Sequence, residues 1–344
     1  MEKKEILNSM KIAIPHSLLY YYYFPLWDTF FKELGFEVVD TGPTTKEILD
    51  KGAKAAVSDI CAPIKIFTGH VIEGLKVADY VFVPRFARIK KPEYFCPKFM
   101  GLPDIIEGTV EESKGRVISP IINEKNNENI SSLRVYEIVA EMFGFSHREI
   151  RLAIKRAEEV FERFKKLMYG GLSCEKALES YKTGRWEEDL EKIKKDGDVT
   201  IAVLGYVYDV YDSFISMDVI KKLEALNVNI KTFEMIPQKV AYDNLKHYRK
   251  RLFWTFSNRV LGAGLHYLKD PTVDGIIHVT AFGCGPDAIV GRFLQYESDI
   301  AGKPFTTLRV DEHTGEGHMV TRIEAFVDML RRKKWAKVSE VLQK

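Results

Sequence analysis

The stretch GIIHVTAFGCGPD occupies residues 275–287 and joins two different sequence patterns. Residues 275–280 form a short apolar run that is typical of a buried strand, and Pro286 is placed to open a helix that continues through Leu294. Cys284 lies between the two patterns. A strand that leads directly into a helix predicts a parallel α/β sheet, in which ligands bind at the carboxyl edge of the strands.

The same alternation of strands and helices extends through the last third of the chain. After this stretch we expect a strand at 305–310 and a closing helix at 320–332. Before it we expect a strand at 200–205, an aromatic loop at 206–214, a helix at 217–226 and a strand at 228–233.

The first part of the chain shows a similar order of elements. It predicts strands at 11–15, 36–40, 53–57 and 80–83, with an aromatic loop at 20–24 and a helix at 26–34 after the first strand. The shared order of strand, aromatic loop, helix and strand predicts two related, doubly wound parallel-sheet domains.

The region between these two parts lacks strand patterns from about residue 131 to residue 195. Apolar residues at helical spacing predict helices at 135–142, 147–168 and 174–181, with many lysines and glutamates on the other faces. The predicted organisation is therefore an N-terminal α/β domain (1–128), a helical connector (129–197) and a C-terminal α/β domain (198–344).

The bulk composition is that of a soluble globular enzyme. Of 344 residues, 46% are hydrophobic and 29% charged, and the formal net charge of +2 gives no field that calls for nucleic acid or an anionic membrane. No run reaches the roughly 18 to 20 apolar residues of a membrane span. Residues 1–10 are charged and lack the apolar core of a signal peptide, so we expect a cytoplasmic protein.

Three of the four cysteines share a sequence context. A proline stands one or two residues after Cys61, Cys96 and Cys284, whereas Cys174 lies in an ordinary helix start without one. Four cysteines in a cytoplasmic chain of this length do not indicate a disulfide scaffold. Proline beside a ligand cysteine recurs at iron–sulfur sites, which favours the three as metal ligands over buried spectators.

The predicted elements place these three cysteines at one kind of position. Cys61 follows the predicted strand at 53–57 and precedes a predicted helix at 63–75, and Cys284 lies between a strand and a helix in the same way. Cys96 lies in a loop beyond the strand at 80–83, from which it can reach the same sheet edge. A ligand shared by all three thiols is expected in the cleft between the two domains.

The cysteine spacing favours iron–sulfur over zinc. The chain has no CxxC pair of the structural-zinc kind, and a site of widely separated thiolates suits a cluster better. Three thiolates on a [4Fe–4S] cluster leave one iron open to water or substrate, which can then act as a Lewis acid. A zinc-bound or metal-free, two-lobed protein that binds a small molecule remains the alternative.

The cysteine segments SDICAPIK (58–65), YFCP with GLPD (94–97 and 101–104) and FGCGPD (282–287) resemble one family. It is the 2-hydroxyacyl-CoA dehydratase and benzoyl-CoA reductase cluster-subunit superfamily, and within it the branch of proteins related to CoA-substrate-specific enzyme activases. The resemblance implies two flavodoxin-like domains with one [4Fe–4S] cluster between them, on Cys61, Cys96 and Cys284.

The resemblance also implies a function in anaerobic metabolism. In that superfamily an ATP-hydrolysing activase donates single electrons of low potential, and the acceptor protein uses them to reduce or dehydrate an acyl-CoA thioester. This chain has no GxxxxGK[ST] phosphate loop, which favours the acceptor over the ATPase. The implied partners are an ATP-dependent activase, an acyl-CoA substrate and a second subunit in a homo- or heterodimer. A non-catalytic electron carrier or cluster scaffold is the alternative.

The polar stretch at 311–318 is a second candidate for chemistry. It holds two histidines and two glutamates, but they lack the helical HExxH spacing of a zinc site, and an ordinary polar turn explains them as well. If the turn lines the active cleft, Glu312 and His313 are the expected proton carriers, and the amides of Gly315 and Gly317 could bind an anion.

Three further features have both a functional and a structural interpretation. The aromatic run at 20–24 could stack on a substrate or shield a cluster, or could pack in the core. Lys65 could contact a phosphate or the cluster, although a single helical lysine is usually solvated. The basic run at 85–91 could attract an acidic partner or CoA phosphates, or could be a solvated loop.

Overall fold

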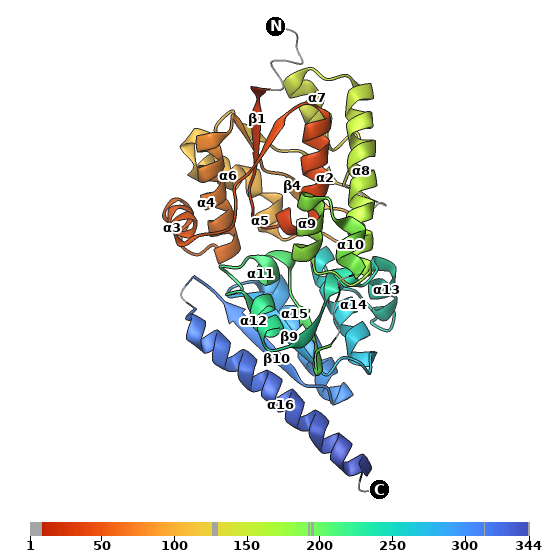
Figure 1. The fold of residues 1–344 in the computed structure, drawn as a ribbon. Coiled ribbons are helices and arrows are strands. Elements are labelled where there is room, and N and C mark those ends of the chain that lie inside the picture. The colour runs from red at the N-terminus through yellow and green to blue at the C-terminus, as the bar shows by residue number, and fades with distance from the viewer. Residues whose placement is uncertain (1–8, 126–129, 192, 194–195, 313, 343–344) are drawn as a thin grey trace. The chain divides into compact units, whose positions relative to one another are not determined.

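The structure is a computed structural model that describes residues 9–125, 130–191, 193, 196–312 and 314–342 (Figure 1). It divides into two compact units, each built around a parallel β-sheet. The first unit runs as far as Leu167 and also contains Cys174–Arg185 and Leu252–Thr255. The second contains Met168–Ser173, Trp186–Arg251 and the chain from Phe256 onward.

The first unit contains a four-stranded sheet in the order β2-β1-β3-β5, with every neighbouring pair parallel. Its elements are β1 (Lys11–Ile14), α2 (Tyr20–Glu33), β2 (Glu37–Asp40), α3 (Lys46–Ala55), α4 (Ala62–Val77), β3 (Tyr80–Phe82), β4 (Arg85–Arg88), α5 (Pro97–Met100), α6 (Leu102–Thr109), η1 (Glu111–Ser113), β5 (Val117–Ile118), β6 (Ile121–Asn123), α7 (Glu137–Phe143), α8 (His147–Tyr169) and α9 (Cys174–Thr183).

The second unit contains a four-stranded parallel sheet in the order β10-β9-β7-β8. Its elements are α10 (Trp186–Glu191), β7 (Val199–Leu204), α11 (Val207–Tyr211), α12 (Val219–Ala225), β8 (Val228–Thr232), η2 (Phe233–Met235), α13 (Gln238–Asn244), α14 (Thr255–Lys269), β9 (Gly275–Ala281), α15 (Gly285–Ala301), β10 (Phe305–Val310) and α16 (Glu316–Leu342).

The two sheets share one topology. When the strands of each sheet are numbered along the chain, both have the order 2-1-3-4, which is the beginning of the flavodoxin-like order. In each unit the chain reverses direction across the sheet after its second strand. Because parallel crossovers are right-handed, the helix before this reversal and the helices after it cover opposite faces of the sheet. The predicted fold class, two doubly wound parallel-sheet domains with a helical segment between them, is confirmed.

The first strand is buried on both faces of the sheet. Its residues are apolar one after another, and successive side chains point to opposite faces. Ile12, Ala13 and Ile14 are all buried. Ala13 faces α4, where a Cβ on Gly74 would lie 2.7 Å from the Ala13 Cβ. Ile14 points to the other face, on the side of α2, and lines a small apolar cavity with Trp27. Figure 1 shows α2 and α4 on either side of β1.

Two strands of the first unit are each interrupted by a proline. β3 and β4 meet at Pro84, and β5 and β6 meet at Pro120, because proline cannot donate to the ladder. The pairing nevertheless continues across the interruption: the Val83 amide donates to the Ile118 carbonyl (2.9 Å), and the Arg85 amide to that of Pro120 (3.0 Å).

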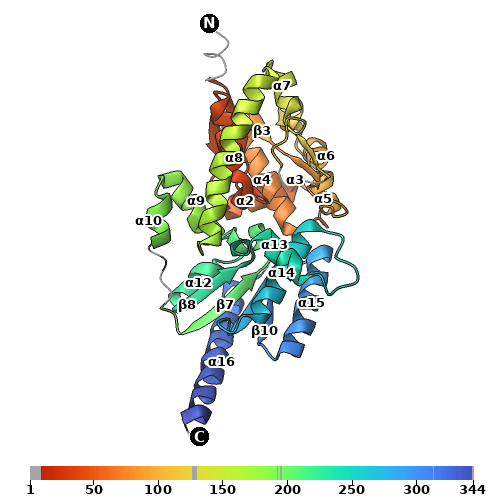
Figure 2. The same ribbon diagram turned by 90° about the vertical axis from the view of Figure 1, so that its right-hand side faces the viewer.

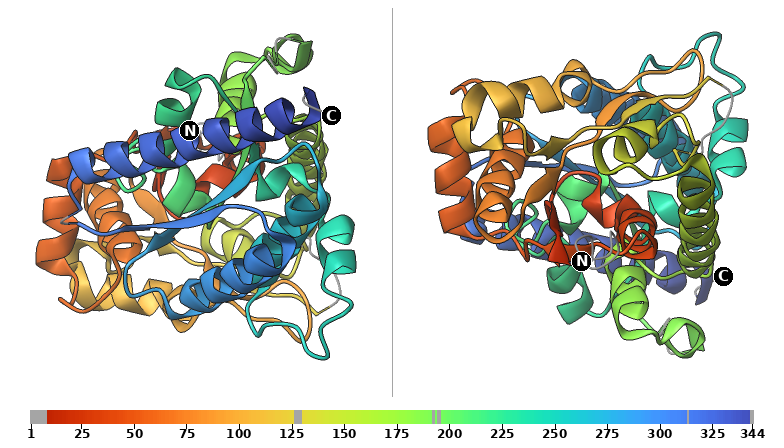
Figure 3. Two further views of the ribbon diagram at one scale, coloured as in Figure 1. Left: turned by 90° about the horizontal axis from the view of Figure 1, so that it is seen from below. Right: turned by 90° about the horizontal axis from the view of Figure 1, so that it is seen from above.

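The sheet of the second unit lies between two layers of helices. A Cβ on Gly264 of α14 would lie 2.2 Å from Leu294 of α15 and 3.0 Å from Leu204 of β7, so both helices cover one face. On the other face, Phe326 and Leu330 of α16 approach Gly275 of β9. Figure 3 shows the strands between α15 and α16 in the view from below.

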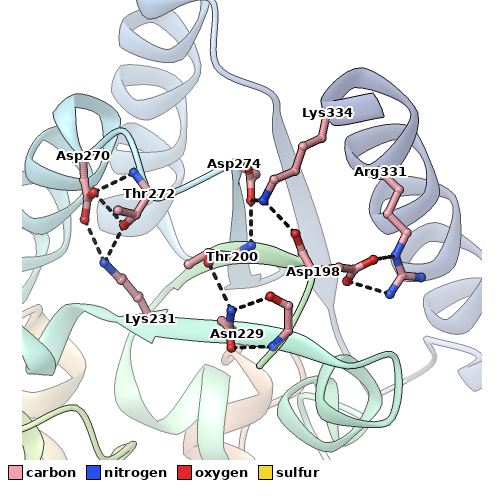
Figure 4. Close-up of polar contacts among 10 residues, drawn as sticks. Asp198, Thr200, Asn229, Lys231, Asp270, Thr272, Asp274, Arg331 and Lys334 are labelled. Atoms are coloured by element: carbon pink, nitrogen blue, oxygen red, sulfur yellow. Dashed lines mark hydrogen bonds and ion pairs between the residues drawn. The ribbon is translucent and has the colours of Figure 1, made fainter. Parts of the chain in front are cut away.

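The amino ends of these strands are tied together by polar contacts (Figure 4). The amide of Thr200 in β7 donates to Asp274 (2.8 Å), which immediately precedes β9. Arg331 of α16 pairs with Asp198 just before β7, with an Nε–Oδ2 distance of 2.5 Å, and Lys334 donates to the carbonyl of Asp198 (2.7 Å). These contacts fix the edge of the sheet at which the strands begin, whereas Cys284 lies at the opposite edge, where the strands end.

Helices α8 and α9 pack along α2 in the first unit (Figure 2). The ring of Phe161 in α8 contacts Tyr22 and Tyr23 of α2, with centroids 5.7 and 5.5 Å apart. Tyr181 of α9 donates to the carboxylate of Asp28 in α2 (2.5 Å). Burying one large aromatic side chain is worth about 1.5–3 kcal/mol, so these rings hold the helical segment on the first unit.

Several sequence predictions differ from the observed elements. The segment 53–57, predicted as a strand, is the end of α3 and the turn after it. The aromatic run 20–24 is the first part of α2 rather than a loop, and its rings are buried. The short helix α11 replaces much of the predicted loop at 206–214, and α16 begins at Glu316 rather than at residue 320.

No helix in the described parts of the chain is long and apolar enough to cross a membrane.

Candidate functional site

The three proline-flanked cysteines share one backbone position. Cys61, Cys96 and Cys284 are the N-cap residues of α4, α5 and α15, and each helix has proline at its first or second position. Their backbones are extended, with ψ of 149°, 155° and 98°. Proline favours this arrangement because its fixed φ suits the first turn of a helix. Each thiol therefore lies where the helix dipole and unpaired amides stabilise a thiolate.

Cys61 lies between two helices, α3 and α4, so its predicted placement after a strand is wrong. Its carbonyl accepts hydrogen bonds from the amides of Ile64 (3.0 Å) and Lys65 (3.3 Å), which closes the first turn of α4. The side chain of Lys65 is buried, so it is not the solvated helical lysine that its sequence context suggested.

Cys96 is partly buried. Burial raises the pKa of its thiol, and the backbone amides of Phe99 and Lys98 act in the opposite direction. The preceding turn is held by a distant segment of the first unit. The Tyr94 amide donates to the Phe253 carbonyl (2.9 Å), and the two rings stack with centroids 4.9 Å apart.

Cys284 lies at the carboxyl end of β9 and the amino end of α15, as the sequence predicted. Gly283 precedes it with φ of +77°, a left-handed conformation that glycine adopts without strain. The thiol lines a pocket of about 310 Å³ between β9, β10 and α15. Both arginines of this pocket, Arg292 and Arg309, are exposed at its mouth.

Ionisable side chains are buried close to this pocket. His278 of β9 and Asp287 of α15 are fully buried, and Nε2 of the histidine lies 3.2 Å from Oδ2 of the aspartate. Asp209 is also fully buried. Burial raises the pKa of Asp209 well above its usual range, the charges of Asp287 and Asp212 add to this, and the Ala281 amide acts against it. No sequence pattern indicated this cluster, although two of its members flank Cys284.

Cys174 differs from the other three cysteines. It is the first residue of α9, it is fully buried, and its thiol donates to the carbonyl of Tyr21 at 2.8 Å. A buried thiol with this partner serves packing between α9 and α2.

The donor set fits an iron–sulfur cluster in its chemistry. None of the four cysteines forms a disulfide, and the three N-cap residues are partly exposed whereas Cys174 is buried. Among the described residues, no three His, Cys, Asp or Glu side chains lie close enough together to hold a metal ion. A cluster held by all three thiols would therefore use Cys61 and Cys96 from the first unit and Cys284 from the second, and this convergence stays a prediction.

The candidate loop at 311–318 is a turn followed by the start of α16. The Thr314 hydroxyl closes the turn: it donates to the Asp311 carboxylate (2.8 Å) and accepts from the Asp311 amide (2.9 Å). Glu312 is half-buried in this turn, and His313 lies outside the described residues. Glu316 pairs with Lys222 of α12 (2.9 Å).

A histidine–aspartate pair in the first unit was also missed. His16 follows β1 and Asp40 ends β2, and Nδ1 of His16 lies 2.8 Å from Oδ1 of Asp40. Tyr20 (2.6 Å) and Lys182 (2.7 Å) donate to the other carboxylate oxygen. Burial acts to raise the pKa of Asp40, but the bonds from His16, Lys182 and Tyr20 outweigh it and hold that pKa below its usual range.

Because Nδ1 of His16 lies against Asp40, Nε2 is the ring nitrogen that this contact does not use. The two residues are neighbours because β1 and β2 pair in parallel, with Ile14 opposite Asp40. Polar residues at the ends of two adjacent strands were the sequence signal that could have found them.

The basic run at 85–91 is partly structural. Arg85 binds Asp104 through both guanidinium nitrogens (2.5 and 2.7 Å) and also donates to the Met100 carbonyl (2.7 Å). The arginine therefore holds α5, the helix that begins after Cys96, and α6 against β4.

Comparison with known proteins gives one family. The family model described as "CoA enzyme activase uncharacterised domain (DUF2229)" matches residues 11–236, which is more than half of the chain. A search of curated proteins finds no match. The matched region includes Cys61, Cys96, the helical segment and the first strands of the second unit. The chain therefore belongs to the family of the CoA enzyme activase uncharacterised domain.

Proposed function

We propose that this chain is a cytoplasmic electron-acceptor protein that holds one [4Fe–4S] cluster on Cys61, Cys96 and Cys284. It would take electrons from an ATP-dependent activase and use them to reduce or dehydrate a small substrate such as an acyl-CoA thioester. The observation that carries the proposal is the shared N-cap geometry of these three thiols, together with the buried, hydrogen-bonded state of the fourth. The family description supports the connection with an activase and a CoA substrate.

The residues around the thiols have separate roles in this proposal. The three helix starts orient the sulfurs and supply amides that stabilise the negative charge of a thiolate-bound cluster. The bound cluster would supply single electrons at low potential and one open iron. Glu312 and His313 are the proposed proton carriers. His16, fixed by Asp40, is a further residue that can hold a proton at Nε2.

The test is metal content in protein purified without oxygen. We expect brown protein with about four irons and a similar amount of sulfide per chain, the content of one cubane. Cys61→Ser, Cys96→Ser and Cys284→Ser should each lower the iron content, because serine is a poor ligand for this metal.

Cys174→Ser is the matched control. It should keep full iron content, because the Cys174 thiol is buried against the Tyr21 carbonyl. Equal iron loss in all four variants would make Cys174 a fourth ligand and the protein a closed-cluster electron carrier. Protein that remains colourless after reconstitution with iron and sulfide would exclude the cluster.

A further inference from the structure

The pocket beside Cys284 has a polar floor with unused hydrogen-bonding groups. Thr280 is 4% exposed and His278 is 0% exposed, and both line the pocket. Among the described residues, Oγ1 of Thr280 and Nδ1 of His278 have no hydrogen-bond partner. A buried hydroxyl without a partner costs about 1–3 kcal/mol, so this position gains from a ligand that supplies one.

Strand register places polar side chains in two adjacent pairs on this floor. In the β9–β10 ladder His278 lies opposite Thr307, and Thr280 lies opposite Arg309. Side chains two residues apart share one face of a strand, so all four face α15. The pocket therefore combines two hydroxyls, an imidazole and a guanidinium on one surface.

The pocket has room above this floor because the residues of α15 that face the floor are small. Gly285, Ala288 and Gly291 line the pocket at successive turns of the helix. A Cβ on Gly291 would lie 2.8 Å from Nδ1 of His278, so a larger residue there would displace the imidazole. The helix also directs its amino end, with its partial positive charge, toward the pocket.

Two guanidinium groups stand at the mouth of the pocket. Arg292 donates to the side-chain oxygen of Gln295 (2.9 Å), and no carboxylate in the described part of the chain pairs with Arg292 or Arg309. A second hollow of about 360 Å³ shares Gln295 and Arg309 with this pocket and adds Arg322 of α16. Arginine binds phosphate through two parallel hydrogen bonds, and two guanidiniums match the two negative charges of a phosphate monoester.

We propose that this pocket of the second unit binds the phosphate group of a small phosphate monoester. Arg292 and Arg309 hold the dianion at the mouth, and the hydroxyls of Thr280 and Thr307 donate to its oxygens. The apolar side chain of Phe282 lines the same pocket and suits an organic substituent better than free phosphate. The inference goes beyond the proposed function, because it requires no cluster.

Calorimetric titration of the metal-free chain of 344 residues at constant ionic strength tests the proposal. The probes are phenyl phosphate, inorganic phosphate and benzoate, which separate the ester from the free ion and the dianion from a carboxylate. Phenyl phosphate should bind more tightly than either of the others. Arg292→Gln and Arg309→Gln should each weaken it by about tenfold or more, the equivalent of one lost charge-assisted hydrogen bond.

Two variants control for effects on folding. Arg332→Gln removes an exposed arginine of α16 that does not line the pocket, and should leave affinity unchanged. Thr280→Val should weaken phenyl phosphate several-fold while its thermal unfolding temperature stays equal or rises, because the lost hydroxyl has no partner among the described residues. Equal affinity for benzoate and phenyl phosphate, absence of phenyl phosphate binding, or equal losses in Arg332→Gln and Arg309→Gln would overturn the proposal.

Discussion

His70 shows how a single buried side chain makes the stability of the first unit depend on pH. It lies in the middle of α4, fully buried, with Nδ1 2.8 Å from Oγ1 of Thr41 and Nε2 3.0 Å from Oγ1 of Thr44. Burial is the main cause that lowers the pKa of His70 to about 3; the nearby His16 acts in the same direction, and Asp40 acts against both. The imidazole is therefore neutral in the folded protein at any ordinary pH.

We predict that this histidine destabilises the fold as the pH falls. An unfolded histidine takes up a proton near pH 6.5, whereas folded His70 does not do so until about pH 3. Its contribution is complete above pH 6.5 and is lost progressively as the pH falls toward 3. Between pH 7 and pH 5 the free energy of unfolding should fall by about 2 kcal/mol through this group, because each pKa unit is worth about 1.4 kcal/mol. Urea unfolding at the two pH values measures it.

His70→Gln is the comparison variant, because glutamine keeps a donor and an acceptor for the two threonines. The fall in unfolding free energy between pH 7 and pH 5 should be about 2 kcal/mol smaller in this variant than in the unmodified chain. An identical fall in both proteins would show that His70 is not the group responsible.

At the residue scale, the sequence was informative where the signal was local. The proline after each of Cys61, Cys96 and Cys284 lies within two residues of the thiol, and it marks the helix starts that the structure has. The pair His16 and Asp40 has no signal within a few residues, because the two are 24 positions apart and meet through strand pairing; only the polar ends of the two strands could have indicated it. The metal ligation itself and the roles of Glu312 and His313 stay predictions.

At the element scale, the close crossing of α3 and α4 positions the helix that Cys61 begins. A Cβ on Gly52 of α3 would lie 1.8 Å from the Lys65 carbonyl oxygen, and one on Gly69 of α4 would lie 2.0 Å from that of Ile48. Real Cβ atoms do not approach backbone so closely. Glycine at both positions therefore lets the two helix backbones touch.

We predict that Gly69→Ala separates these helices and destabilises the first unit by about 1–3 kcal/mol or more, the usual cost of overpacking. Gly108→Ala in α6 is the matched control. Its Cβ would meet nothing within 4 Å, so it should stabilise the protein by about 0.5–1 kcal/mol through reduced backbone freedom in the unfolded chain. Thermal unfolding measures both. A Gly69→Ala protein as stable as the control would contradict the close crossing.

The same helix pair explains the clearest error of the sequence analysis. Residues 53–57 read AKAAV, a short apolar run that fits a strand or a helix end equally well. Their structure is decided by tertiary packing of α3 on α4, which a local pattern does not contain. The strand at 305–310 was predicted with its observed bounds, because it continues for six residues and is followed by a polar turn.

At the scale of the whole molecule, the repeated strand order accounts for where Cys96 and Cys284 lie. Both sheets have the order 2-1-3-4, and Cys284 follows the third strand of its sheet. Cys96 follows the third strand of the first sheet, after the β4 extension. The alternation of elements made this architecture predictable, whereas residues 252–255, which belong to the first unit although they lie far along the chain, carry no signal of their own.

We predict that adding iron and sulfide changes amide hydrogen exchange in both units at once. If one cluster is held by all three thiols, loading should slow amide hydrogen exchange at the starts of α4, α5 and α15 together. The physical reason is that thiolates bound to the cluster accept hydrogen bonds from first-turn amides and fix each N-cap residue. Exchange measured by mass spectrometry under anaerobic conditions, with and without the metal, reports each helix start separately.

The cysteine variants decide what this protection means. Cys174→Ser should show the same protection as the unmodified chain, because its thiol packs against α2. Cys284→Ser should lose protection at all three helix starts, including the two in the first unit, since two thiols alone do not retain the cluster. Protection limited to α4 and α5 in the unmodified chain would instead assign the metal to the first unit alone. Cys284 would then be left to the pocket that it lines with Arg292 and Arg309.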